Sequence, residues 1–250
     1  MKLSAAKVKA HNEAMALVNS DHVLSHEECI FILENYQEGA NNINSATGAF
    51  FTPTQLAIDF ATEIPSGATI VDLCAGIGAI AYFSYHHSRA KSITCVELNA
   101  EYIKVGKRIL PEATWVQADA LTFTSDQLFD VAISNPPFGT IKTSNAEGKA
   151  YKGSKFEYKV IEHASHLAKY GFFILPQQSS GFLYSGQQSY SECPSASLEN
   201  FKKQTNIQFE LSSIDTSLYL NDWKGVKPMC EVVTSTFPHK VQSNEFRLVG

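Results

Sequence analysis

Short apolar runs alternate with longer helical patterns through the middle of the chain. The runs predict strands over Thr69–Leu73, Ser92–Glu97, Thr114–Gln117 and Phe129–Ser134. Helical periodicity predicts helices over 77–86 and 99–109. Strands that alternate with helices in this way form a parallel sheet with helices on both faces, so we expect ligand-binding residues at the carboxyl ends of the strands.

The segments before this region are predominantly helical. Residues 4–19 are rich in helix-forming residues, and Ser25 with Glu28 forms a capping box that predicts a second helix to about residue 38. A polar loop over 39–48 follows, and Pro53 marks the start of a third helix that ends near residue 63.

The last third of the chain has a weaker pattern. A helix is expected over 156–169, and it leads into a fifth strand over 172–175. Two further strands are expected over 207–213 and 230–237, and the segment between them, 218–223, fits a loop or a helix equally well.

Composition narrows the class of protein. The chain has 250 residues, 44% of them hydrophobic, and a net charge of -5, which excludes a protein that coats nucleic acid through bulk positive charge. Its five cysteines contain no Cys-x-x-Cys pair, so neither a disulfide framework nor a zinc site is expected. We find no signal-peptide core and no apolar run of the roughly 18 residues that suggest a membrane span. These features favour a cytoplasmic protein without a membrane partner.

A glycine-rich turn follows the first strand of the alternating region. Asp72 ends the strand, and Gly76 and Gly78 let the backbone approach a ligand closely. Glu97 lies about 20 residues on, where an acidic residue can bind ribose hydroxyls. Because a carboxylate at Asp72 would repel a pyrophosphate but can hold a cationic amino group, S-adenosylmethionine suits this turn better than a nicotinamide cofactor.

Two further positions complete the expected cofactor site. Asp119 follows the third strand, where it either accepts a hydrogen bond from an adenine amino group or caps a helix. Thr52 precedes the helix that begins near Pro53, where helix N–H groups and its hydroxyl favour a carboxylate. Simple capping of that helix by Thr52 is the alternative.

The segment Asn135-Pro136-Pro137-Phe138 follows the fourth strand. The prolines fix φ and have no N–H, so this rim is rigid and rich in hydrogen-bond acceptors. The Asn135 side-chain oxygen and the Pro136 carbonyl can accept both hydrogens of an aromatic amino group, which turns the nitrogen lone pair toward a methyl donor. Phe138 can stack on an extruded base. This chemistry requires no metal.

Together these motifs resemble the class I, Rossmann-like methyltransferases. Their order is similar to that of the gamma-class DNA adenine-N6 methyltransferases and the modification subunits of restriction systems, and the resemblance covers residues 49–176. It implies a three-layer α/β fold with a mostly parallel seven-stranded sheet and N-terminal helices. The expected divisions are a helical extension over 1–48, a catalytic domain over 49–240 and a tail over 241–250.

The resemblance also assigns residues to roles. The expected catalytic residues are Asn135, Pro136, Pro137 and Phe138. The expected S-adenosylmethionine site comprises Phe51, Thr52, Pro53, Asp72, Ala75, Gly76, Gly78, Glu97, Leu98, Asp119, Ala120 and Asn135.

A lysine-rich segment after the catalytic motif is the expected nucleic-acid contact. Its candidates are Lys142, Lys149, Tyr151, Lys152 and Lys155, whose charges can hold phosphates and whose aromatic neighbours can stack bases. The alternative is a solvated loop with core aromatics.

Adenine N6 in nucleic acid is the expected target, with DNA favoured over RNA because of the segment Phe51-Thr52-Pro53. Three alternatives stay open: an RNA adenine-N6 enzyme, a protein glutamine N5 methyltransferase, and a non-catalytic binding subunit. Little sequence remains for target recognition after the core, so a partner subunit or a second copy of the chain is a possible source of target recognition.

Overall fold

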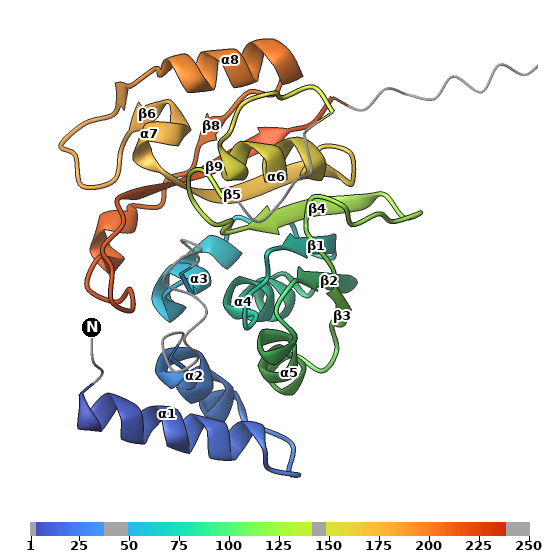
Figure 1. Ribbon diagram of the computed structural model, residues 1–250, viewed down its shortest axis with the longest axis vertical. Coiled ribbons are helices and arrows are strands. Elements are labelled where there is room, and N and C mark those ends of the chain that lie inside the picture. The colour runs from blue at the N-terminus through green and yellow to red at the C-terminus, as the bar shows by residue number, and fades with distance from the viewer. Residues whose placement is uncertain (1–3, 38–49, 142–148, 239–250) are drawn as a thin grey trace, which may run out of the picture.

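The computed structural model describes residues 4–37, 50–141 and 149–238. Within these ranges the chain forms an α/β fold with a mostly parallel seven-stranded sheet and N-terminal helices (Figure 1). The expected boundary at residue 48, the expected tail over 241–250 and Lys142 lie outside the described residues.

Two N-terminal helices precede the sheet. Helix α1 (Ala5–Val18) is capped by the Ser4 side chain, and α2 (His26–Asn35) carries the predicted capping box between Ser25 and Glu28. Both caps satisfy N–H groups that the first helical turn leaves without a partner.

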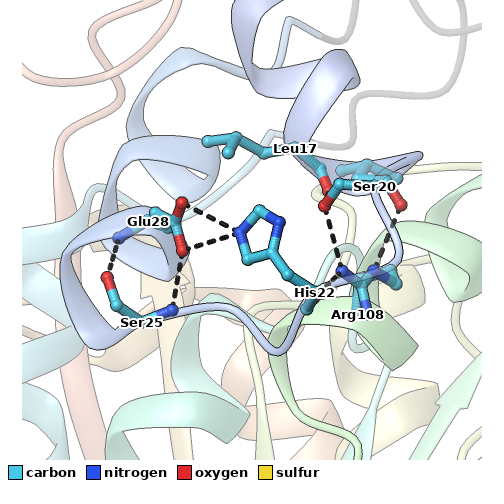
Figure 2. A network of polar contacts seen from close by, with 7 residues as sticks. Leu17, Ser20, His22, Ser25, Glu28 and Arg108 are labelled. Atoms are coloured by element: carbon cyan, nitrogen blue, oxygen red, sulfur yellow. Dashed lines mark hydrogen bonds and ion pairs between the residues drawn. The ribbon is translucent and has the colours of Figure 1, made fainter.

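Arg108 of α5 (Ala100–Ile109) attaches these helices to the rest of the molecule (Figure 2). Its Nε donates to the Val18 carbonyl at 3.2 Å, and its Nη2 donates to the His22 carbonyl at 2.8 Å. His22 in turn lies 3.0 Å from the Glu28 carboxylate. The turn between α1 and α2 is therefore held by a residue about 90 positions further along the chain.

The alternating region has the predicted elements. After α3 (Thr54–Ala61) come β1 (Thr69–Leu73), α4 (Ala79–Ser88), β2 (Ser92–Glu97), α5, β3 (Thr114–Gln117) and β4 (Phe129–Ser134). All four strands match the expected bounds. Short apolar runs bounded by turn residues leave little freedom in where a strand begins and ends.

The C-terminal part departs from the expected bounds. Its elements are α6 (Phe156–Ala164), β5 (Ala168–Pro176), α7 (Gln177–Ser180), β6 (Phe182–Leu183), β7 (Ser191–Glu192), α8 (Ala196–Thr205), β8 (Glu210–Leu211), η2 (Thr216–Tyr219) and β9 (Cys230–Thr236). The helix expected to reach residue 169 ends at Ala164, because Ala168 pairs with Phe129 of β4. The strand expected over 207–213 is shorter in the structure, where only Glu210–Leu211 pairs with β9.

The strand order of the main sheet is β3-β2-β1-β4-β5-β9-β8. The pairs from β3 to β5 are parallel, and β9 runs antiparallel to β5. Since β1 and β4 are neighbours and lead to opposite halves of the sheet, their carboxyl ends form a topological switch point, where ligands bind in folds of this kind.

The two faces of the sheet carry separate cores. On one face Ile70, Ile133 and Ile174 pack with α3, α4 and α5, and the N-terminal helices extend this cluster. On the other face Val71, Ala132 and other strand residues pack with α6 and α8. Figure 1 shows these helices on opposite sides of the sheet. Successive strand residues point to opposite faces, so both faces of the central strands are buried.

Candidate active site

The turn after β1 is built from residues with unusual backbone angles. Cys74, Gly76 and Gly78 all have positive φ, at 66°, 57° and 90°. Gly76 also lies close to Phe51, because a Cβ at this position would be 3.3 Å from the Phe51 ring. The turn is thereby brought against the segment that leads into α3, and a small cavity lies between them.

The cavity gathers residues from three distant parts of the sequence. Its lining is Phe50, Phe51, Thr52, Asp72, Cys74, Ala75, Gly76, Ala79, Ile80 and Asn135. Six of these residues were expected in the cofactor site. The other four residues, which were not expected there, are Phe50, Cys74, Ala79 and Ile80. Phe50 and Cys74 are next to expected residues in the sequence, and Ala79 and Ile80 form the first turn of α4. Their nearness to the motifs was the signal that could have identified them.

Asp72 is the most unusual group in the cavity. Its side chain is 1% exposed, and among the described residues its Oδ1 has no hydrogen-bond partner. Burial raises the pKa of Asp72 well above its usual range, and the nearby Glu97 carboxylate raises it further. A buried carboxyl oxygen without a partner is costly, and a cationic or hydrogen-bonding ligand would remove that cost.

Glu97 ties the ends of β1 and β2 together. Its Oε2 accepts from the Gly76 N–H at 2.8 Å, and its Oε1 accepts from the Asn99 N–H at 2.8 Å. Burial raises the pKa of Glu97, and these backbone hydrogen bonds oppose the shift. Because each carboxylate oxygen has two lone pairs, Glu97 can still accept from ligand hydroxyl groups.

The remaining expected cofactor residues lie around this cavity without lining it. Gly78 is the N-cap of α4 and packs against Trp115, and Pro53 is the N-cap of α3. Leu98 is exposed, whereas Ala120 is buried. Asp119 Oδ1 accepts from the Leu121 N–H at 2.8 Å within a turn, and the described residues between β3 and β4 form no helix, so the helix cap considered for Asp119 is wrong.

Asn135 is held in one orientation. Its Nδ2 donates to the Phe50 carbonyl at 3.1 Å and to Thr52 Oγ1 at 2.9 Å. A carbonyl can only accept, so the atom facing Phe50 must be the amide nitrogen. The amide oxygen, Oδ1, consequently points elsewhere, and it is buried without a hydrogen-bond partner in the described part of the chain.

The rest of the Asn-Pro-Pro-Phe motif lies at the end of β4. Ser134 Oγ donates to the Leu73 carbonyl, which joins the ends of β4 and β1. Pro136 is buried, whereas Pro137 and Phe138 are half-buried. Phe138 packs at the margin of the core on the side of α3 and α4. The motif therefore borders the cavity with part of its aromatic ring accessible.

The lysine-rich segment does not form one surface. Tyr151 is 1% exposed and packs against Tyr158 and Phe201, with ring centroids 5.6 Å and 5.4 Å away. It is a core residue, and the expectation that it stacks on a base is wrong. Lys155 is partly buried, and its Nζ donates to Ser179 Oγ at 2.8 Å. Lys149 and Lys152 are exposed, and among the described residues of the expected contact these two are the surface lysines.

Comparison with known proteins supports this interpretation of the fold. Residues 51–154 match the family described as the methyltransferase small domain, a range that begins at Phe51 and includes the whole Asn-Pro-Pro-Phe motif. This match and the fold support a class I S-adenosylmethionine-dependent methyltransferase. Its cofactor is S-adenosylmethionine. None of the curated proteins is similar to this methyltransferase.

Solved structures share the fold of this methyltransferase at low sequence identity. A Listeria monocytogenes protein proposed to be a class I methyltransferase matches with a TM-score of 0.62 and 17% identity, over 94% of this chain and 74% of that one. A Pyrococcus horikoshii protein proposed to be an RNA methyltransferase matches with a TM-score of 0.55 and 17% identity, over 86% and 100%. The 23S rRNA methyltransferase ErmE matches with a TM-score of 0.51 and 13% identity, over 77% and 71%.

The described residues also bear on membrane spans and metal sites. None of their helices is long and apolar enough to cross a membrane. They also contain no group of three or more His, Cys, Asp or Glu side chains placed to hold a metal ion.

Proposed function

We propose that this methyltransferase transfers the methyl group to the exocyclic N6 nitrogen of adenine in nucleic acid, with DNA as the favoured substrate. One observation carries the proposal. Asn135 offers a buried, unpartnered Oδ1 beside a cavity lined by Asp72 and Gly76, while its Nδ2 is fixed by Phe50 and Thr52. A fixed acceptor next to a methyl donor is the arrangement that an amino-group nucleophile needs.

The cavity residues fit S-adenosylmethionine. Asp72 would receive the cationic amino group of its methionine part, which gives the unpartnered Oδ1 a charged partner. Glu97 would accept from the ribose hydroxyls, and the Asp119 oxygen not bonded to the Leu121 N–H would accept from the adenine amino group. When bound, the cofactor supplies an electrophilic methyl group on a sulfonium.

The protein's part in the reaction is to prepare the nucleophile. Asn135 Oδ1 and the Pro136 carbonyl accept the two hydrogens of the adenine amino group, so the nitrogen becomes pyramidal and its lone pair faces the methyl group. The nitrogen would then be placed to take the methyl group that the cofactor supplies and would release one of its protons to water. Since the Asn135 amide is already fixed by Phe50 and Thr52, it would need little reorganisation at the transition state.

Phe138 and the surface lysines would hold the substrate. The accessible part of the Phe138 ring lies at the rim of the motif, where an unpaired base can stack. Lys149 and Lys152 are exposed on the segment that follows the motif and can contact phosphates. A local contact of this kind suits a protein with a net charge of -5.

RNA is the second candidate substrate, because a 23S rRNA methyltransferase has the same fold. DNA and RNA as candidate substrates are distinguished by separate incubations of the purified protein with labelled S-adenosylmethionine. Each incubation contains duplex DNA, single-stranded DNA, structured RNA or total protein. Digestion to nucleosides should give labelled N6-methyldeoxyadenosine from DNA. Label in RNA alone would select the second candidate, and label only in protein glutamine would overturn both.

A further inference from the structure

Helix α6 carries two buried carboxylates beside the catalytic segment. Glu157 is 1% exposed and Glu162 is 3% exposed, although both belong to a residue type that rarely lies in a protein interior. They lie five positions apart, and their hydrogen bonds go to different ends of the segment that connects β4 with α6. Buried carboxylates need such partners, so the contacts show what each one holds.

Glu157 holds the end of the segment that adjoins the catalytic motif. Its Oε2 accepts from the Gly139 N–H at 2.8 Å, immediately after Phe138. Its Oε1 accepts from the Ser179 hydroxyl at 2.9 Å, and that hydroxyl oxygen accepts from Lys155 Nζ at 2.8 Å. Since Ser179 lies on α7, directly after β5, Glu157 joins the ends of two neighbouring strands.

The motif needs such an anchor because of its own sequence. Pro136 and Pro137 have no N–H, so donor bonds to the sheet cannot hold them. On one side the motif is fixed by the Asn135 side chain, through Phe50 and Thr52. On the other side the chain turns at Gly139, where φ is 83°, and the Gly139 carbonyl accepts from the Phe156 N–H at 2.8 Å. Glu157 accepts a hydrogen bond from the N–H of Gly139 and so fixes the peptide that joins Phe138 to Gly139.

We propose that Glu157 is a positioning residue for methyl transfer, which keeps Asn135, Pro136 and Phe138 in their reactive arrangement by binding the Gly139 N–H. It acts through the backbone and does not touch the substrate. The inference rests on the proposed function for the identity of the reaction, but the anchoring itself is a property of the protein without substrate.

Glu162 provides a matched control on the same helix. It accepts from the backbone N–H groups of Ala150 and Tyr151, at the far end of the segment. Replacing either glutamate by alanine leaves backbone N–H groups without this acceptor, which costs up to about 1–3 kcal/mol of stability for each group that is buried. The two variants therefore share a loss of stability but differ in whether the catalytic motif loses its anchor.

The test compares Glu157→Ala, Glu157→Gln and Glu162→Ala with the unmodified protein. In single-turnover methyl transfer with saturating cofactor and substrate, we expect Glu157→Ala to lower the rate by about 10- to 100-fold, because small displacements of reacting groups have effects of this size. Cofactor affinity should be unchanged. Glu157→Gln should keep most of the rate, since its amide oxygen can accept from Gly139 while its amide nitrogen donates to Ser179. Glu162→Ala should keep the unmodified rate.

Amide hydrogen exchange of the peptide that contains Gly139 gives a second readout that needs no substrate. Exchange should be faster in Glu157→Ala and unchanged in Glu162→Ala.

If Glu157→Ala does not fold, Glu157→Asp replaces it, because that side chain is one methylene too short to keep both contacts. Equal rates in the two alanine variants, or unchanged Gly139 exchange, would overturn the proposal. A protein that methylates no nucleic acid would instead overturn the proposed function, and the exchange result would still decide the role of Glu157.

Discussion

The Nδ2 atom of Asn135 lies 2.9 Å from the Oγ1 atom of Thr52, across 83 positions of sequence. Thr52 precedes α3, whose N-cap is Pro53, so its hydroxyl is available to accept from Asn135. This hydrogen bond, with the one to the Phe50 carbonyl, decides which way the Asn135 amide faces. A residue near the start of the matched range thereby sets the geometry of the proposed catalytic side chain.

Replacement of Thr52 tests this relationship. Thr52→Val has nearly the same shape but no acceptor, so Asn135 Nδ2 loses one partner and the amide becomes less firmly oriented. We expect the transfer rate to fall about tenfold, which corresponds to about 1.4 kcal/mol at the transition state. Thr52→Ser keeps the hydroxyl and should keep most of the rate. Initial rates at saturating cofactor would show this, and equal rates for the two variants would contradict it.

Replacement of Asn135 separates chemistry from cofactor binding. Asn135→Ala removes the acceptor for the substrate amino group, so we expect transfer to be abolished while cofactor affinity, measured by calorimetry, stays largely intact. Asn135→Asp should also be inactive and less stable, because a carboxylate oxygen would face the Phe50 carbonyl. A parallel loss of cofactor binding in the alanine variant would place Asn135 in the cofactor site instead.

Asp72→Asn should change stability and binding in opposite directions. The folded-state pKa of Asp72 lies above its unfolded value, so its contribution to stability is complete below about pH 4 and is lost as pH rises through the folded pKa. Asparagine has no such loss, so the cofactor-free variant should melt at a higher temperature than the unmodified protein at neutral pH. Cofactor should bind at least about tenfold more weakly, since a charge-assisted hydrogen bond is removed. Melting curves and calorimetry would test both parts, and unchanged affinity would remove Asp72 from the site.

Asp130→Asn tests a link at the opposite, amino-terminal ends of the central strands β1 and β4. Lys169 and the Thr69 backbone and hydroxyl donate to Asp130 and lower its pKa to about 2. The resulting stability is present above the unfolded pKa near 4 and is lost as pH falls toward 2. Because the Asp130 side chain is 40% exposed, the effect should be about 1 kcal/mol or less. Urea unfolding should show the variant less stable at pH 7 and the difference closing near pH 2, with transfer activity unchanged.

The sequence by itself determined the central strands and the positions of the motifs at their ends. Short apolar runs and turn residues are local signals, so Thr69–Leu73 and Phe129–Ser134 were predicted with their observed bounds. The capping box at Ser25 was a local signal as well. Where a strand depends on its partner, prediction was less accurate, as at Ala168, which pairs with Phe129 and ends the helical pattern early.

Only the tertiary structure decided the orientation, burial and contacts of the candidate site residues. The orientation of Asn135, the burial of Tyr151 and the contact of Glu157 with Gly139 each depend on atoms that the local sequence does not specify. The same applies to the unpartnered oxygens of Asp72 and Asn135, because burial is set by the packing of several elements at once. Residue types and spacing thus determined the kind of chemistry, whereas long-range contacts decided which atoms are free to perform it.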